Sequence, residues 1–117
     1  MHALTKKTFE EKVLKSKKIA VVEFSGENCQ PCLRLKPIME KIRSTYRDKE
    51  YIDFFILDMK GNDELFHRFN IMTIPHTAIF YKGKVIDEMI GFKDEQTILE
   101  FLKRNIVVIN QPPYFVE

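Results

Sequence analysis

The feature that most constrains the fold of this chain is a cysteine pair within "IAVVEFSGENCQPC", residues 19–32. Residues 19–24 form a nearly continuous, largely β-branched apolar run, which predicts a strand buried on both faces. Cys29 and Cys32 follow this run, and from residue 30 to about residue 46 apolar side chains recur at helical spacing. The pair is therefore expected where a buried strand passes into a helix.

The rest of the chain continues the alternation of helices and strands. The pattern predicts a first helix with a capping box at Thr8 and Glu11, a strand at 51–57, a short helix after Asn62, a hairpin of 76–81 and 85–90, and a last helix capped by Asp94. A strand–helix–strand opening implies parallel pairing, and the hairpin adds antiparallel strands. The expected fold class is therefore α/β with a mixed sheet.

Composition limits the classes of protein to which the chain can belong. A length of 117 residues, with 44% hydrophobic and 31% charged residues, indicates one globular domain. The 19 basic and 17 acidic residues are well mixed, which argues against a nucleic-acid binder. No apolar run approaches the ~18 residues of a membrane span. The first residues are charged where a signal peptide needs an apolar core, so we expect a cytoplasmic protein.

Three interpretations of the cysteine pair are open from the residues alone. A structural disulfide would stabilise little, because the loop that it closes is very short. Zinc could recruit Cys29, Cys32, His67 and His76. The third interpretation is redox chemistry: the start of a helix lowers the pKa of a thiol, and a cysteine three residues on lies on the same face. Pro31 suits the first helical turn, where its missing N–H costs nothing. In this third case Cys29 attacks and Cys32 resolves.

Several further motifs give the chain its resemblance to the thioredoxin family. The motif "CQPC" has the family's Cys-x-Pro-Cys form, Pro37 matches the proline of its active-site helix, and "TIPH" at 73–76 matches its cis-proline loop. The turn "YKGK" and Gly91, before the last helix, also match. The resemblance covers about residues 4–105 and implies a thioredoxin fold, a three-layer α/β/α sandwich around a mixed central sheet. We accordingly expect a thioredoxin-like domain at residues 1–105 and a C-terminal extension at 106–117.

The resemblance also implies the site and its partners. It implies that Cys29, Cys32, Glu23 and Pro31 carry the chemistry. It further implies that the Ile74–Pro75 bond is cis and faces the disulfide. Substrate-binding positions follow from the same comparison: Asn28, Gln30, Ile74, Pro75 and Gly91. The expected activity is protein disulfide reduction by a monomer that needs no cofactor or metal. Since the chain has no Gly-x-Gly-x-x-Gly motif, a separate thioredoxin-reductase-like donor must supply the electrons.

This chain departs from the family pattern at four positions near the motif. Asn28 and Ser25 stand where tryptophan is usual, and the chain has no tryptophan. Glu23 replaces the usual aspartate, and Phe54 replaces a common lysine. With no lysine beside it, Glu23 is expected to stay protonated to unusually high pH because of desolvation. In the alternative, its longer side chain reaches a surface lysine.

Two other functions remain open beside the cytoplasmic reductase. One is a specialised extracytoplasmic thiol–disulfide protein. The other is a binding module with slow redox turnover, which the loss of both tryptophans would favour. His76 is interpreted as structural rather than as a base or a pH sensor. In the thioredoxin fold His67 would lie on a helix remote from the motif, which argues against zinc.

Overall fold

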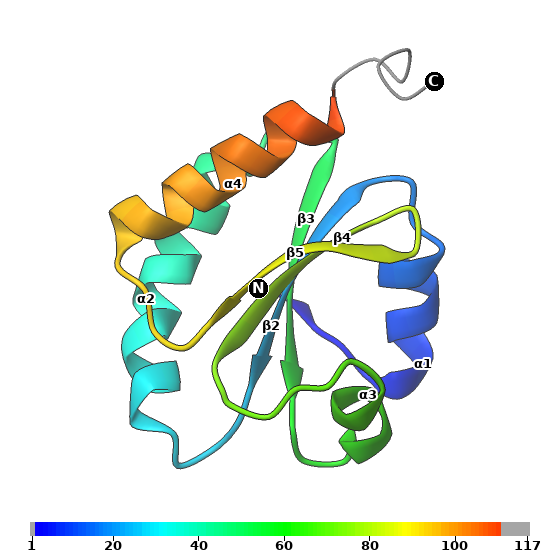
Figure 1. Ribbon diagram of the computed structural model, residues 1–117, viewed down its shortest axis with the longest axis vertical. Helices are drawn as coiled ribbons and strands as arrows, with labels where there is room; N and C mark the ends of the chain where they lie inside the picture. Colours follow the sequence, from blue (N-terminus) through cyan, green and yellow to red (C-terminus); the bar gives the residue numbers. More distant parts are fainter. Residues whose placement is uncertain (1, 111–117) are drawn as a thin grey trace.

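The computed structural model describes residues 2–110, and within them a five-stranded mixed sheet runs in the order β1-β3-β2-β4-β5 (Figure 1). The strands are β1 His2–Ala3, β2 Ile19–Ser25, β3 Ile52–Asp58, β4 His76–Tyr81 and β5 Lys84–Ile90. The helices are α1 Lys6–Phe9, the π-helical turn η1 Glu10–Leu14, α2 Gln30–Thr45, α3 Asp63–Arg68 and α4 Glu95–Ile109. β2 pairs in parallel with β3 and antiparallel with β4.

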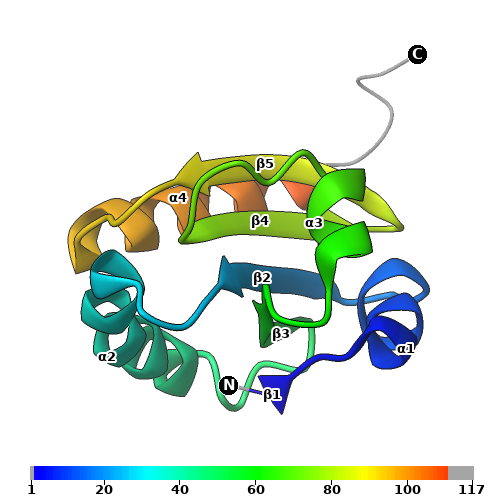
Figure 2. The ribbon, with the colours of Figure 1, turned by 90° about the horizontal axis from the view of Figure 1, so that it is seen from below.

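Helices cover both faces of the sheet, as Figures 1 and 2 show, with α1 and α3 on one side and α2 and α4 on the other. The alternation along β2 explains the two layers, since successive side chains of a strand point to opposite faces. Ala20, Val22 and Phe24 lie in the core beside α1 and α3, whereas Ile19 and Val21 lie in the core beside α2 and α4. The expected α/β sandwich with a mixed sheet is confirmed.

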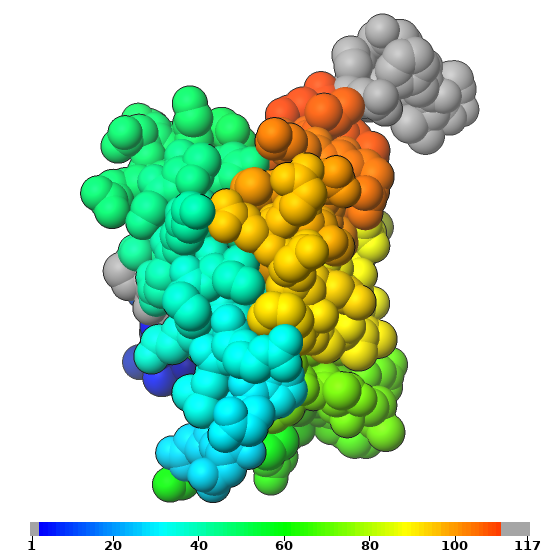
Figure 3. Space-filling model, turned by 90° about the vertical axis from the view of Figure 1, so that its left-hand side faces the viewer, coloured from blue at the N-terminus to red at the C-terminus, as the bar shows by residue number. Residues whose placement is uncertain are grey.

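The α2–α4 layer presents a continuous surface, and Figure 3 shows these two helices side by side. α2 buries Leu35, Met39 and Ile42, and the side chains of Lys41 and Glu95 form an ion pair of 3.2 Å that links the two helices. No helix within residues 2–110 has the length and apolar character needed to cross a membrane.

The N-terminal region differs most from the sequence-based expectation. The two-residue strand β1, which extends the sheet beside β3, was not predicted. The capping box at Thr8 and Glu11 was wrong: Thr5 is the N-cap, its hydroxyl accepts from the Thr8 N–H at 3.2 Å, and the Thr8 hydroxyl accepts from the Thr5 N–H at 2.8 Å. Helix α4 continues to Ile109, past residue 105, while residues 111–117 of the expected extension lie outside the described part of the chain.

Candidate active site

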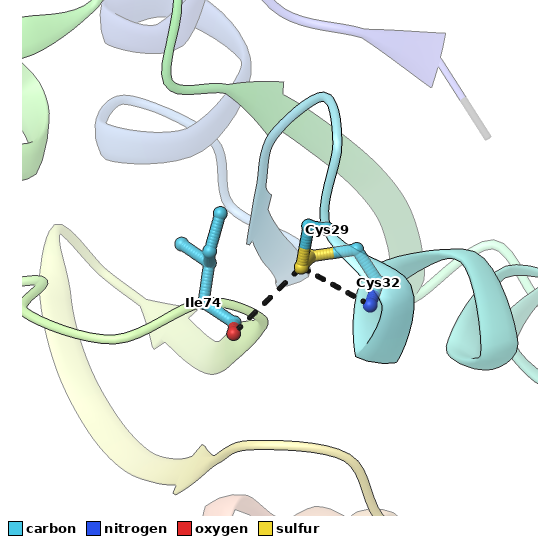
Figure 4. The surroundings of a disulfide bond; sticks show 3 residues. All are labelled: Cys29, Cys32 and Ile74. Atoms are coloured by element: carbon cyan, nitrogen blue, oxygen red, sulfur yellow. Dashed lines mark hydrogen bonds between the residues drawn. A yellow bond between two sulfur atoms is a disulfide. The ribbon is translucent and has the colours of Figure 1, made fainter.

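The cysteine pair lies between the end of β2 and the first turn of α2. Asn28 adopts a left-handed conformation with φ of 53°, which turns the chain, and Cys29 is the N-cap of α2. Cys29 and Cys32 form a disulfide with a Cα–Cα distance of 5.2 Å. The Cys29 Sγ accepts a hydrogen bond from the Cys32 N–H at 3.2 Å (Figure 4). The first turn of α2 therefore directs a backbone N–H, which has no acceptor within the helix, at the Cys29 sulfur. This N–H would stabilise the negative charge of a Cys29 thiolate.

The two sulfurs differ in their exposure to solvent. Cys32 is buried, with 5% of its surface exposed, and Cys29 is half-buried. Around them, Asn28 and Gln30 are exposed and Pro31 occupies the first turn of α2. An incoming disulfide can therefore reach Cys29 more readily than Cys32.

The loop before β4 faces this disulfide. The Ile74–Pro75 bond is cis, as the resemblance implied, and the Ile74 carbonyl oxygen lies 3.9 Å from the Cys29 Sγ (Figure 4). The Pro75 carbonyl accepts a hydrogen bond of 2.7 Å from the Gly91 N–H, and Gly91 has φ of 87°, a value that favours glycine. The structure thus brings Cys29, Ile74, Pro75 and Gly91 together at one end of the sheet.

Gly26 is a residue of the site that the sequence analysis missed. A Cβ atom at this position would lie 2.8 Å from the Ile74 Cδ1, closer than such atoms approach in proteins. A side chain at position 26 would therefore require the end of the Ile74 side chain to shift. An isolated glycine just after a buried strand was the available signal, because glycine there often marks a close approach of another segment.

Glu23 is a buried carboxyl group on the α2 side of β2. It is 1% exposed, and neither carboxylate oxygen has a hydrogen-bond partner among the described residues. Desolvation raises the pKa of Glu23 to about 7. The Ser25 side chain is the strongest opposing influence, Glu40 adds a smaller upward contribution, and Lys36 a still smaller downward one. The expected direction and cause are confirmed, and the alternative in which Glu23 reaches a surface lysine is wrong.

Phe54 lies on β3 at the position where the family resemblance implied a lysine near Glu23. Phe54 is 4% exposed. On the neighbouring strand β2 its register partner is Val21, which lies two residues before Glu23. Its ring packs beside Tyr46 with centroids 5.8 Å apart. An aromatic ring at this position contributes apolar surface but no positive charge, so nothing from Phe54 offsets the desolvation of Glu23.

The histidines do not form a metal site with the cysteines. Within the described residues, no group of three or more His, Cys, Asp or Glu side chains lies close enough to hold a metal ion. His67 lies on α3, and His76 is buried at the start of β4, where its Nε2 lies 2.6 Å from the Glu88 Oε1. The sequence analysis missed this pair, because its two members are brought together only by strand register.

Comparison with known proteins agrees with this geometry. The sequence model of the thioredoxin family matches residues 1–104. A thioredoxin of Rickettsia bellii is 32% identical over 103 residues, which cover 88% of this chain and 96% of the relative. A thioredoxin of Buchnera aphidicola is 33% identical, covering 88% and 94%, and thioredoxin 2 of Chlorobaculum tepidum is 31% identical, covering 87% and 92%. The chain therefore belongs to the thioredoxin family, and its Cys-x-x-Cys pair makes it a thiol–disulfide oxidoreductase.

Proposed function

We propose that this protein is a protein disulfide reductase in which Cys29 attacks and Cys32 resolves. The observation that carries the proposal is the difference between the two sulfurs: Cys29 is half-buried at a helix N-cap, while Cys32 is buried behind it. In the reduced protein, the Cys29 thiolate attacks one sulfur of a substrate disulfide. The other substrate sulfur leaves as a thiolate and takes a proton from water, and a mixed disulfide with Cys29 remains.

Glu23 serves as the proton acceptor for the second step. The Cys32 thiol gives its proton to the Glu23 carboxylate, and the Cys32 thiolate then attacks the Cys29 Sγ. The Cys29–Cys32 disulfide forms, the second substrate sulfur leaves as a thiolate, and two electrons have passed to the substrate. A pKa of about 7 supports this role, because such a carboxyl group can both accept and release a proton near neutral pH.

Substrate binding uses the backbone opposite the disulfide. Ile74 and Pro75 present an open edge to which an extended substrate segment can add as a strand, while Gly91 supports this loop through its bond to Pro75. Asn28 and Gln30, both exposed beside Cys29, contact the substrate around its disulfide. Pro31 stiffens the first turn of α2 between the two cysteines.

The electrons come from a separate dithiol donor of the thioredoxin-reductase type. With that donor the protein acts as a monomeric electron carrier that serves redox homeostasis in the cytoplasm. Support for a reducing compartment comes from the cysteine content, since the two cysteines of the chain are both in the motif. Residues 1–105 form the redox domain in this proposal, and residues 106–117 are an extension of it.

Single-cysteine variants test the assignment of the two sulfurs. We expect Cys29→Ser to abolish the reduction of insulin disulfides and to capture no substrate. Cys32→Ser should instead accumulate mixed disulfides, which a non-reducing gel resolves. Capture by Cys29→Ser would reverse the roles of the two sulfurs. If the wild-type protein binds partners without reducing insulin, the binding-module function replaces the reductase.

Equilibration with glutathione tests the direction of the reaction. We expect a reduction potential near that of reducing thioredoxins, because the motif brings no positive charge from Gln30 to stabilise the Cys29 thiolate. The pair should therefore be mostly disulfide in an oxidising glutathione mixture. A pair that stays mostly dithiol there would make the protein an oxidant.

A further inference from the structure

An open groove of about 510 Å³ lies along β5, outside the cysteine site. Its far wall is Phe69 and Asn70, at the start of the segment that leads from α3 to β4 and runs past β5 in Figure 2. Apolar side chains of β5 line the other wall: Val85, Ile86 and Ile90. Ile86 and Ile90 are 39% and 58% exposed, so apolar surface is available here for a ligand.

This groove begins next to the loop that faces the disulfide, because His76 and Ile90 line it. The Ile74 carbonyl lies 3.9 Å from the Cys29 Sγ, and the next carbonyl, of Pro75, is bonded to the Gly91 N–H. His76 follows Pro75, and Ile90 precedes Gly91. These two residues pair in register between β4 and β5, and both line the groove. A substrate segment bound over Ile74 therefore passes beside the groove.

A carboxylate is fixed in this otherwise apolar setting. The Oε1 of Glu88 lies 2.6 Å from the Nε2 of His76, whose ring is buried and packs edge-on against Phe24 with centroids 6.0 Å apart. The other ring nitrogen of His76, Nδ1, is buried without a partner among the described residues. The side chain of Glu88 is 44% exposed, so its carboxylate can also be reached from solvent.

Asp87 and Glu88 are the acidic residues that line the groove. No lysine or arginine of the described chain lines it. The guanidinium group of Arg68 lies over the ring of Phe69, which lines the groove, 5.2 Å from its centroid. Asp87 also borders the groove, but its carboxylate accepts a hydrogen bond of 3.0 Å from the Asn105 amide, and Arg104 lies 3.9 Å from the same oxygen. Glu88 is thus the carboxylate available to a ligand.

We propose that this groove is a specificity subsite for a basic side chain, lysine or arginine, of the disulfide substrate. The proposal rests on the proposed reductase function. The apolar walls formed by Ile86 and Ile90 fit the methylene stem of the basic side chain, and Glu88 pairs with its cationic end. His76 is a positioning residue, because it holds the Glu88 carboxylate in one orientation from a buried ring.

Peptide disulfides that differ at one side chain test the subsite. The probes are fluorophore-labelled peptides, each dimerised through a single cysteine so that its fluorescence is quenched until reduction. Lysine, norleucine or glutamate is placed in turn at each of five positions on either side of the cysteine. The pre-reduced protein is mixed with excess peptide, and the second-order rate constant is measured at low and high salt.

We expect lysine at one or two positions to be reduced about two- to fivefold faster than norleucine, and glutamate more slowly than norleucine. The preference should shrink at high salt. Glu88→Gln should bring the ratio of lysine to norleucine close to one. The matched control is Asp87→Asn, which makes the same change in charge at the neighbouring residue and should keep the preference, because the Asp87 carboxylate is already held by Asn105 and Arg104.

The norleucine peptide separates the failure of this inference from the failure of the reductase function. If the wild-type protein reduces all three peptides equally fast at every position, the subsite does not exist although the reductase function stands. If Asp87→Asn and Glu88→Gln lose the preference for lysine equally, the effect comes from the overall electrostatic field of the protein. This result would overturn the proposal. If no peptide is reduced, the proposed function fails and this inference fails with it.

Discussion

At the scale of single residues, Glu23 is a carboxyl group that folding removes almost completely from water. It is 1% exposed, without a hydrogen-bond partner among the described residues, and its pKa is raised to about 7 from an ordinary 4.5. Between these two pH values the folded protein holds a proton that the unfolded chain has released. The free energy of unfolding must therefore fall as the pH rises through this range.

Glu23→Gln should remove this dependence on pH. The wild-type protein is expected to lose about 3 kcal/mol of stability between pH 4.5 and pH 7, and the variant should lose much less, because its amide does not ionise. Urea unfolding at several pH values measures the difference, with Glu100→Gln as a control for an exposed carboxyl group on α4. Parallel stability curves for the wild-type and Glu23→Gln proteins would show that Glu23 is not the responsible group.

The same substitution has a kinetic consequence at neutral pH. Glu23→Gln should slow the release of the second substrate thiol and leave the first attack by Cys29 almost unchanged. Rapid-quench analysis of the mixed disulfide between pH 6 and pH 9 distinguishes the two steps. Unchanged resolution across this range would remove Glu23 as the proton acceptor.

At the scale of elements, the N-terminal helix shows how a motif can be displaced by three residues. Thr8 and Glu11 have the spacing of a capping box, but Thr5 and Thr8 form it. Both pairs of residues have the three-residue spacing of a capping box. The position at which the chain leaves β1 determines which pair caps the helix. β1 consists of two residues and is too short to show a periodic pattern in the sequence. The first residue of the helix could therefore not be predicted.

Thr5→Ala tests the cap that the structure shows. We expect it to lower the free energy of unfolding by about 1 kcal/mol, because the Thr8 N–H loses its acceptor. Glu11→Ala is the matched control, and at this exposed position it should change stability by less than about 0.5 kcal/mol. The reverse order of effects, measured by urea unfolding, would return the cap to Thr8.

At the scale of the whole molecule, the buried strands could be predicted because their side chains form runs or alternations. The run at 19–24 became β2, and the disulfide pair could be predicted from its place after that run. Contacts between segments that are distant in the sequence could not be predicted. The approach of Gly26 to Ile74 and the pairing of His76 with Glu88 depend on how strands and loops meet, and neither leaves a local pattern.

The central position of β2 should also make the backbone next to the cysteine site resistant to local unfolding. β2 is paired with β3 on one side and with β4 on the other, and both of its faces are covered. Its backbone amides should therefore exchange with deuterium only when the whole domain unfolds, while those of β5, an edge strand, exchange sooner. Native-state exchange followed by mass spectrometry would contradict this if β2 exchanged as fast as β5. Since Cys29 follows β2 after only a short turn, the sulfur that we propose as the attacker would then be attached to the last part of the protein to open.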